Sequence, residues 1–164
     1  MKQQDKELEI GGVSFGLMSG VITTLGMIVG INAATESKLA IVASIFATAV
    51  ADSLSDALGM HLAEESRLDE ANKPIWVISL YTFLAKFTVT LVFAIPFLFF
   101  SNNLALVFSV IFGLCLVFLL SIFAAKRSNN SVFESVIEHV SLAIIVIVAS
   151  YYVGSLTERI VSNG

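Results

Sequence analysis

The chain has 164 residues, of which 57% are hydrophobic and 13% are charged, and its mean hydropathy is +0.90. Soluble domains carry about 25% charged residues, so this composition excludes a water-soluble fold, a disordered segment and a nucleic-acid-binding protein. The net charge of −4 argues against a polybasic surface for lipids or phosphate. The single cysteine, Cys115, excludes a disulfide framework within one chain.

Apolar stretches follow one another along the chain. They lie at about 11–31, 39–63, 75–100, 104–125 and 132–155. A spanning helix needs about 20 apolar residues, so five of them use roughly 100 residues and leave only short loops. We therefore predict an all-α polytopic membrane protein whose residues 1–164 form a single five-helix transmembrane domain. Pro74 is placed to open the third helix, and Pro96 is placed to kink it.

Basic residues outside these stretches predict the orientation. One side of an alternating topology receives Lys2, Lys6, Arg67, Lys73, Lys126 and Arg127, and the other receives Lys38 and Arg159. Because lysine and arginine favour the cytoplasmic side, we expect a cytoplasmic N-terminus and an external C-terminus. The first stretch is too long for a cleavable signal and follows an acidic leader, so we expect it to stay in the protein. A multi-pass protein of a prokaryotic cell membrane is the expected setting, or of a vacuolar-type membrane in a eukaryote.

Rows of small residues run along the first two stretches. Every fourth residue of 39–63 gives Ala43, Ala47, Ala51, Ser55, Gly59 and Ala63. The first stretch carries one row of Gly12, Gly16, Gly20 and Thr24 and another of Gly26 and Gly30. Helices in lipid associate by close packing, and small side chains allow their backbones to approach. We predict that each row is a helix contact.

A polar row lies next to the small row of the second stretch. It consists of Thr48, Asp52, Asp56, Met60 and Glu64, with His61 nearby. An ionisable side chain at the bilayer centre costs between about 2.5 and more than 10 kcal/mol, so it persists mainly where it faces a cavity or a partner. We predict that Asp52 and Asp56 form a cation site or a proton relay.

A buried ion pair is the alternative, and Lys86 of the third stretch is the available partner. Asp52 lies 11 residues from Ala63 and Lys86 lies 11 residues from Ile75, so each is about 16 Å deep at a rise of 1.5 Å per residue. The two side chains are therefore expected at the same level. In this alternative Asp56 is left uncompensated.

Further candidate ligands lie near the expected cytoplasmic ends of the helices. His61, Glu64 and Glu65 stand at i, i+3 and i+4, which suits divalent iron, manganese or zinc, although an acidic run can equally be a solvated face. The candidate metal ligands are thus Asp52, Asp56, Met60, His61, Glu64 and Glu65. The fifth stretch opens with Glu134, Glu138 and His139, which either form an electronegative cytoplasmic mouth or simply favour a helix N-terminus.

Two segments carry a family resemblance. Residues 12–17 read GVSFGL, and residues 51–63, about 35 residues later, read ADSLSDALGMHLA. These segments resemble the patterns G-V-S-D-G-L and A-G-S-I-S-M-G-L-G-G-Y-L-A of the vacuolar iron transporter family of divalent-metal transporters. Residues 83–96 resemble the third span of that family, and residues 151–156 resemble its closing Y-x-x-G-x-L. The resemblance covers nearly the whole chain.

The resemblance implies a homodimer whose metal path lies between the protomers, lined by the first and second spans, and which exchanges a divalent metal for protons. The chain departs from the family at three places. Phe15 replaces a first-span aspartate, Asp56 replaces a second-span methionine, and the metal-collecting insert shrinks to residues 64–74. We expect a divergent prokaryotic-type member that lacks the insert and whose acidic function has moved to the second span.

The leading interpretation is a dimeric transporter of divalent transition-metal cations, iron or manganese, coupled to protons taken up by Asp52, Asp56 or His61. The metal is its substrate, no cofactor is permanently bound, and the partners are protons, membrane lipid and a second copy, without nucleic acid. An enzyme is not expected, because an intramembrane aspartyl hydrolase needs carboxylates from separate helices. The alternative is a non-transporting membrane scaffold whose polar centre is neutralised by Asp52 with Lys86.

Overall fold

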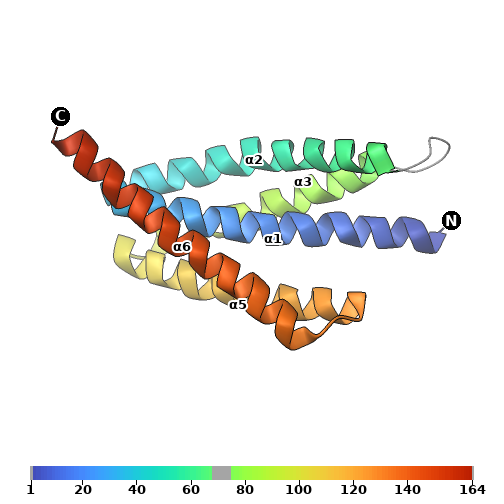
Figure 1. Cartoon of the computed structure of the whole chain (residues 1–164). Helices are drawn as coiled ribbons and strands as arrows, with labels where there is room; N and C mark the ends of the chain where they lie inside the picture. The colour runs from blue at the N-terminus through green and yellow to red at the C-terminus, as the bar shows by residue number, and fades with distance from the viewer. Residues whose placement is uncertain (1, 68–74, 164) are drawn as a thin grey trace.

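The computed structural model describes residues 2–67 and 75–163, which are helical apart from short turns (Figure 1). In chain order the helices are α1 (Lys2–Thr35), α2 (Lys38–Arg67), α3 (Ile75–Val92), α4 (Ala94–Phe99), α5 (Asn102–Ser128) and α6 (Val132–Ser162). Five segments are long and apolar enough to cross a membrane: Glu9–Thr35, Lys38–Ser66, Ile75–Phe99, Asn102–Ser128 and Val132–Ser162. The predicted all-α polytopic architecture is confirmed. Four of the segments are longer than the predicted apolar stretches, and the third ends one residue earlier than predicted.

Successive long helices run in opposite directions, so α1 begins at one end of the bundle and α6 finishes at the other (Figure 1). Which end is cytoplasmic stays a prediction. Pro74 and Lys73, which belong to the predicted connection between the second and third spans, lie outside the described residues.

The helix is interrupted close to the kink predicted at Pro96: α3 ends at Val92 and α4 begins at Ala94, with the single turn residue Phe93 between them. Proline has no N–H, and its ring collides with the carbonyl group four residues earlier, which here belongs to Val92, the last residue of α3. Phe93 N–H instead donates to the Thr90 carbonyl at 3.2 Å, which tightens the turn. Phe93 and Phe97 are fully buried and pack the break into the core.

Helix α1 is the centre of the bundle, and both of its glycine rows are filled. A Cβ on Gly20 would lie 2.6 Å from Val89 Cγ1 and 3.1 Å from Lys86 Cγ, both on α3. A Cβ on Gly26 would lie 2.8 Å from Val146 Cγ1 and 2.9 Å from Ser150 Oγ, both on α6. Both predicted contacts are confirmed, and each row serves a different partner helix.

Helix α2 turns its small row away from the rest of the chain. Its buried residues lie on the other face, which packs on α1, α3 and α4: Ile41, Ile45, Ala49, Ser53, Ala57 and Glu64. All the residues of the small row, Ala43, Ala47, Ala51, Ser55, Gly59 and Ala63, are exposed. A Cβ on Gly59 would meet no atom within 4 Å. The helix contact predicted for this row is therefore not made within one chain.

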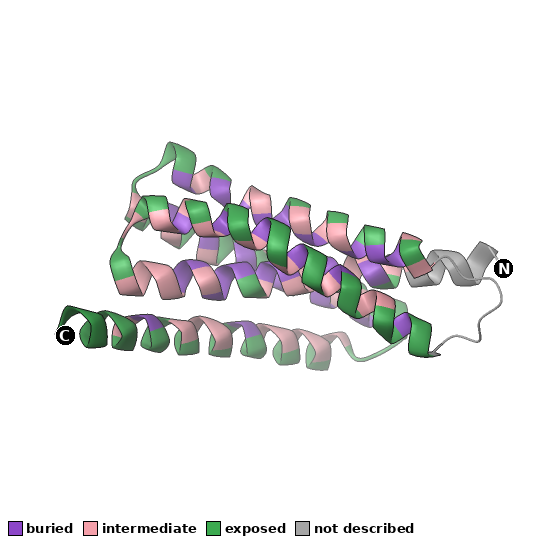
Figure 2. Cartoon of the chain, turned by 90° about the horizontal axis from the view of Figure 1, so that it is seen from above, coloured by how far each residue is buried: buried purple, intermediate pink, exposed green. Residues whose placement is uncertain are grey.

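Helix α6 lies at the edge of the bundle and is largely exposed (Figure 2). Its buried residues are Ala143 and Gly154. Gly154 meets the backbone of Gly30 on α1, so closely that a Cβ at this position would collide with the Gly30 carbonyl.

Candidate functional site

Lys86 of α3 is the centre of a polar cluster inside the apolar bundle. Its side chain is 1% exposed, and its stem passes Gly20 of α1, where a larger residue would leave no room. Lys86 Nζ lies 2.6 Å from Asp52 Oδ2 and 2.6 Å from Asp56 Oδ2. The ion pair between Asp52 and Lys86, one of the alternatives drawn from the sequence, is thus present.

The expectation that Asp56 is left uncompensated is wrong. The two aspartates stand one helical turn apart on α2, and the ammonium group of Lys86 lies between their carboxylates. It donates a hydrogen bond to Asp56 Oδ2 at 2.6 Å and another to Ser19 Oγ at 3.0 Å. One cation therefore serves both anions.

Two hydroxyl groups of α1 complete the cluster. Ser19 Oγ donates to Asp56 Oδ2 at 2.6 Å, and Thr23 Oγ1 donates to Asp52 Oδ2 at 3.1 Å. Neither residue was predicted as part of the site. In the sequence, their i, i+4 spacing indicates that both hydroxyl groups lie on one face of the helix. Phe15 lies one turn before Ser19 on the same face. Phe15, the position where the family pattern has its aspartate, is exposed on this side of α1.

The cluster carries two negative charges and one positive charge, so it keeps a formal charge of −1. Lys86 is buried, whereas the side chains of Asp52 and Asp56 are 33% and 21% exposed. Asp52 lies about 21 Å along α2 from Lys38, close to the middle of the helix. The carboxylates therefore point toward α1 and α3 at mid-depth and are partly exposed at the edge of this contact, beside the exposed small row of α2.

The other candidate ligands of α2 are less closely associated. His61 Nδ1 lies 3.3 Å from Ser79 Oγ, and its ring lies 4.1 Å from the ring of Trp76, centre to centre, with the two planes inclined at 41°. Glu64 is buried, and Glu65 is exposed. Within residues 2–67 and 75–163 no group of three or more histidine, cysteine, aspartate or glutamate side chains is placed to hold a metal ion. Metal binding by Met60, His61, Glu64 and Glu65 stays a prediction.

The predicted mouth residues stand apart from the aspartates. Glu134 and Glu138 are exposed near the beginning of α6, where Ser131 caps the helix by accepting from Glu134 N–H at 3.4 Å. His139 Nδ1 lies 3.4 Å from Ser135 Oγ. In Figure 1, α1 lies between this end of α6 and helix α2. One chain therefore does not join Glu134, Glu138 and His139 to the cluster around Lys86.

All the protein ligands of the cluster are hard oxygen atoms from Asp52, Asp56, Ser19 and Thr23. Such atoms suit ammonium, magnesium, manganese and ferrous ions better than soft ions. Comparisons of the chain with protein-family models, with curated proteins and with solved structures find no match. The resemblance to the vacuolar iron transporters therefore stays a prediction.

Proposed function

We propose that the protein is a homodimeric membrane transporter of divalent transition-metal cations, iron or manganese, that exchanges them for protons. One observation carries this proposal. Asp52 and Asp56 hold a positive charge between them at mid-depth in the bundle, and both side chains are partly exposed beside the small row of α2.

The exposure of these carboxylates supports a dimer. A charge that faces acyl chains at the bilayer centre costs between about 2.5 and more than 10 kcal/mol, so an aspartate that is partly exposed at this depth needs a cavity or a partner on its exposed side. The exposed small row on the same helix allows a second α2 to approach closely. A symmetric pair would place four carboxylates and two lysines around one path between the protomers.

The position of Lys86 supports a cation as substrate. Its ammonium group occupies the space that a divalent cation would need, within 2.6 Å of both carboxylates. Lys86 would act as a tethered competitor that moves aside when the travelling ion binds. Asp52, Asp56 or His61 would take up the protons that move in the opposite direction.

A non-transporting scaffold is the second candidate, and the same ion pairs favour it. Lys86 pairs with both aspartates, as a structural ion-pair centre would, although a formal charge of −1 is left. Replacing a buried ionic cluster by apolar groups is often neutral or stabilising, whereas removing one partner is destabilising. A scaffold should therefore keep its fold and its biological activity when all three charges are removed together. A transporter with the same three changes should keep its fold and lose its flux.

The deciding experiment is flux into liposomes that contain the purified protein, with manganese, ferrous iron, cobalt, zinc and magnesium tested under an imposed pH gradient. We expect flux of manganese or ferrous iron with opposite proton movement, and at least a tenfold loss in Asp52→Asn and Asp56→Asn. Glu158→Gln, an exposed change near the end of α6, is the matched control and should keep full flux. No flux of any ion in the unaltered protein would refute transport and leave the scaffold.

A further inference from the structure

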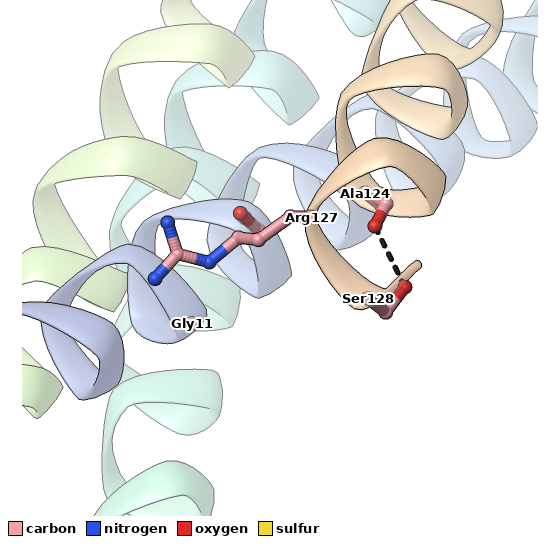
Figure 3. A pocket seen from close by; sticks show the side chains of 5 residues that line it. Gly11, Ala124, Arg127 and Ser128 are labelled. Atoms are coloured by element: carbon pink, nitrogen blue, oxygen red, sulfur yellow. Dashed lines mark hydrogen bonds between the residues drawn. The ribbon is translucent and has the colours of Figure 1, made fainter. Parts of the chain in front are cut away.

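A cavity of about 560 Å³ lies between the beginning of α1 and the end of α5, on different helices from the aspartates (Figure 3). It is lined by Gly11, Ser14, Ala124, Arg127 and Ser128. The guanidinium group of Arg127 extends from α5 toward Gly11 of α1 (Figure 3). A Cβ on Gly11 would meet no atom within 4 Å, so this side of the cavity is open. Among the described residues of the lining, the charged one, Arg127, is basic.

Polar groups in this cavity are left without protein partners. Within the described part of the chain, neither the guanidinium group of Arg127 nor the hydroxyl group of Ser14 makes a side-chain hydrogen bond or an ion pair. Arginine in a last turn is favoured by the helix dipole, but among the described residues Arg127 makes no hydrogen bond to a carbonyl group of α5. Ser128 Oγ donates to the Ala124 carbonyl at 2.8 Å, and Asn130 N–H donates to the Ala125 carbonyl at 3.0 Å. Arg127 is therefore available for a ligand.

The position of the cavity indicates which ligand. The first membrane-spanning segment begins at Glu9 and the fourth ends at Ser128, so the cavity lies where lipid headgroups meet the protein. Leu119, Phe123 and Arg127 follow one another at i, i+4 and i+8 on α5, and the two apolar side chains are exposed. An apolar track thus leads along the helix to an unpaired guanidinium group, which matches a molecule with an acyl chain and an anionic head.

We propose that this cavity binds the phosphate group of an anionic membrane phospholipid. Arg127 pairs with the phosphate oxygens, Ser14 donates a hydrogen bond from α1, and an acyl chain lies along Leu119 and Phe123. The apolar track favours a lipid over free phosphate. The overall charge of −4 does not oppose this site, because charges beyond about 8 to 10 Å are screened at an exposed position. The proposal is independent of cation transport.

Native mass spectrometry of the detergent-purified protein tests the site, with dioctanoyl phosphatidylglycerol as the probe. The unaltered protein should retain this lipid in preference to dioctanoyl phosphatidylcholine. Arg127→Gln should weaken retention about tenfold, because a charge-assisted bidentate contact is lost. Gly11→Leu should weaken it similarly by filling the cavity without changing any charge. Arg159→Gln, near the far end of α6, is the control and should retain the lipid.

Three outcomes would overturn the proposal. Equal retention by the unaltered protein and by Arg127→Gln would show that the guanidinium group holds no lipid. Equal losses in Arg127→Gln and Arg159→Gln would show that only overall charge matters. Displacement of the lipid by inorganic phosphate at similar concentration would identify a site for the free ion. Thermal unfolding in the same detergent checks that both variants of the cavity are folded.

Discussion

Helices α1 and α2 both carry rows of small residues at helical spacing, but the two helices use them differently. The glycine rows of α1 receive side chains and backbone of α3 and α6, so an added methyl group would collide with Val89 or Val146. The row of α2 faces outward along its whole length, and an added methyl group on Gly59 would collide with nothing. The same sequence pattern therefore builds the bundle in one helix and leaves a free surface in the other.

The neighbours of each row explain the difference. The rows of α1 alternate with buried apolar residues such as Val21, Leu25 and Ile28, so closing them completes the core. The row of α2 runs beside Asp52 and Asp56, whose carboxylates remain partly exposed. In lipid a small-residue surface is useful only when another helix reaches it. This free row beside two partly exposed aspartates is the surface that the proposed dimer and its ion path would use.

The largest loss in the free energy of unfolding is expected when a bulky side chain replaces a glycine in one of the rows of α1. Gly16→Leu would drive its side chain into the backbone of α3, where a Cβ would lie 2.5 Å from the Thr82 carbonyl oxygen. We expect a loss of more than about 3 kcal/mol in the free energy of unfolding, because the backbones must separate. Unfolding of the purified protein in mixed micelles measures it. Gly59→Leu is the matched control, and an equal loss there would contradict the contrast between the rows.

A somewhat smaller loss in the free energy of unfolding is expected when the ion pairs between α2 and α3 are removed. Lys86→Met leaves Asp52 and Asp56 without their shared cation and should lower the free energy of unfolding by about 3 kcal/mol. This is the lower end of the range for breaking a buried ion pair, because both aspartate side chains are partly exposed. The same unfolding assay measures this cost. Restoration of stability in the triple variant Lys86→Met, Asp52→Asn, Asp56→Asn is the expected counterpart. A triple variant as unstable as the single one would show that the ion pairs are not the cause.

A change on the free row should affect association rather than folding. Gly59→Leu should weaken the dimer about tenfold, because a bulky side chain keeps two helices from close approach, while unfolding of the single chain stays unchanged. Energy transfer between labelled copies in liposomes at graded protein-to-lipid ratios measures the association. Ser141→Leu, an exposed position on α6, is the control. Unchanged association in Gly59→Leu would remove the small row from the dimer surface.

The smallest effect is expected at the hydroxyl groups of α1. Thr23→Val removes the 3.1 Å hydrogen bond to Asp52 and keeps the shape of the side chain, so it should cost about 1 kcal/mol in unfolding. Thr35→Val, at the exposed end of α1, is the control. A loss as large as that of Lys86→Met would mean that the hydroxyl group, rather than the ammonium group, holds Asp52.

Much of this architecture could be predicted from the sequence, because length and hydropathy determine which segments enter lipid. The depth of Asp52 and Lys86 followed from counting residues at a fixed helical rise. Rotation about the helix axis does not follow from such counting. The rotation of α1 determines that Ser19 and Thr23 face α2. The rotations of α2 and α3 determine that Lys86 reaches Asp56 as well as Asp52, and that the small row of α2 faces outward. The neighbours that determine rotation come from distant parts of the chain.

The attachment of α6 to α1 depends on glycine. The buried residues of this helix of 31 residues are Ala143 and Gly154, and Gly154 lies at a crossing where its backbone meets that of Gly30. Val146 and Ser150 pack between them against Gly26 of α1. A bulky side chain at Gly26, Gly30 or Gly154 would therefore separate the two helices.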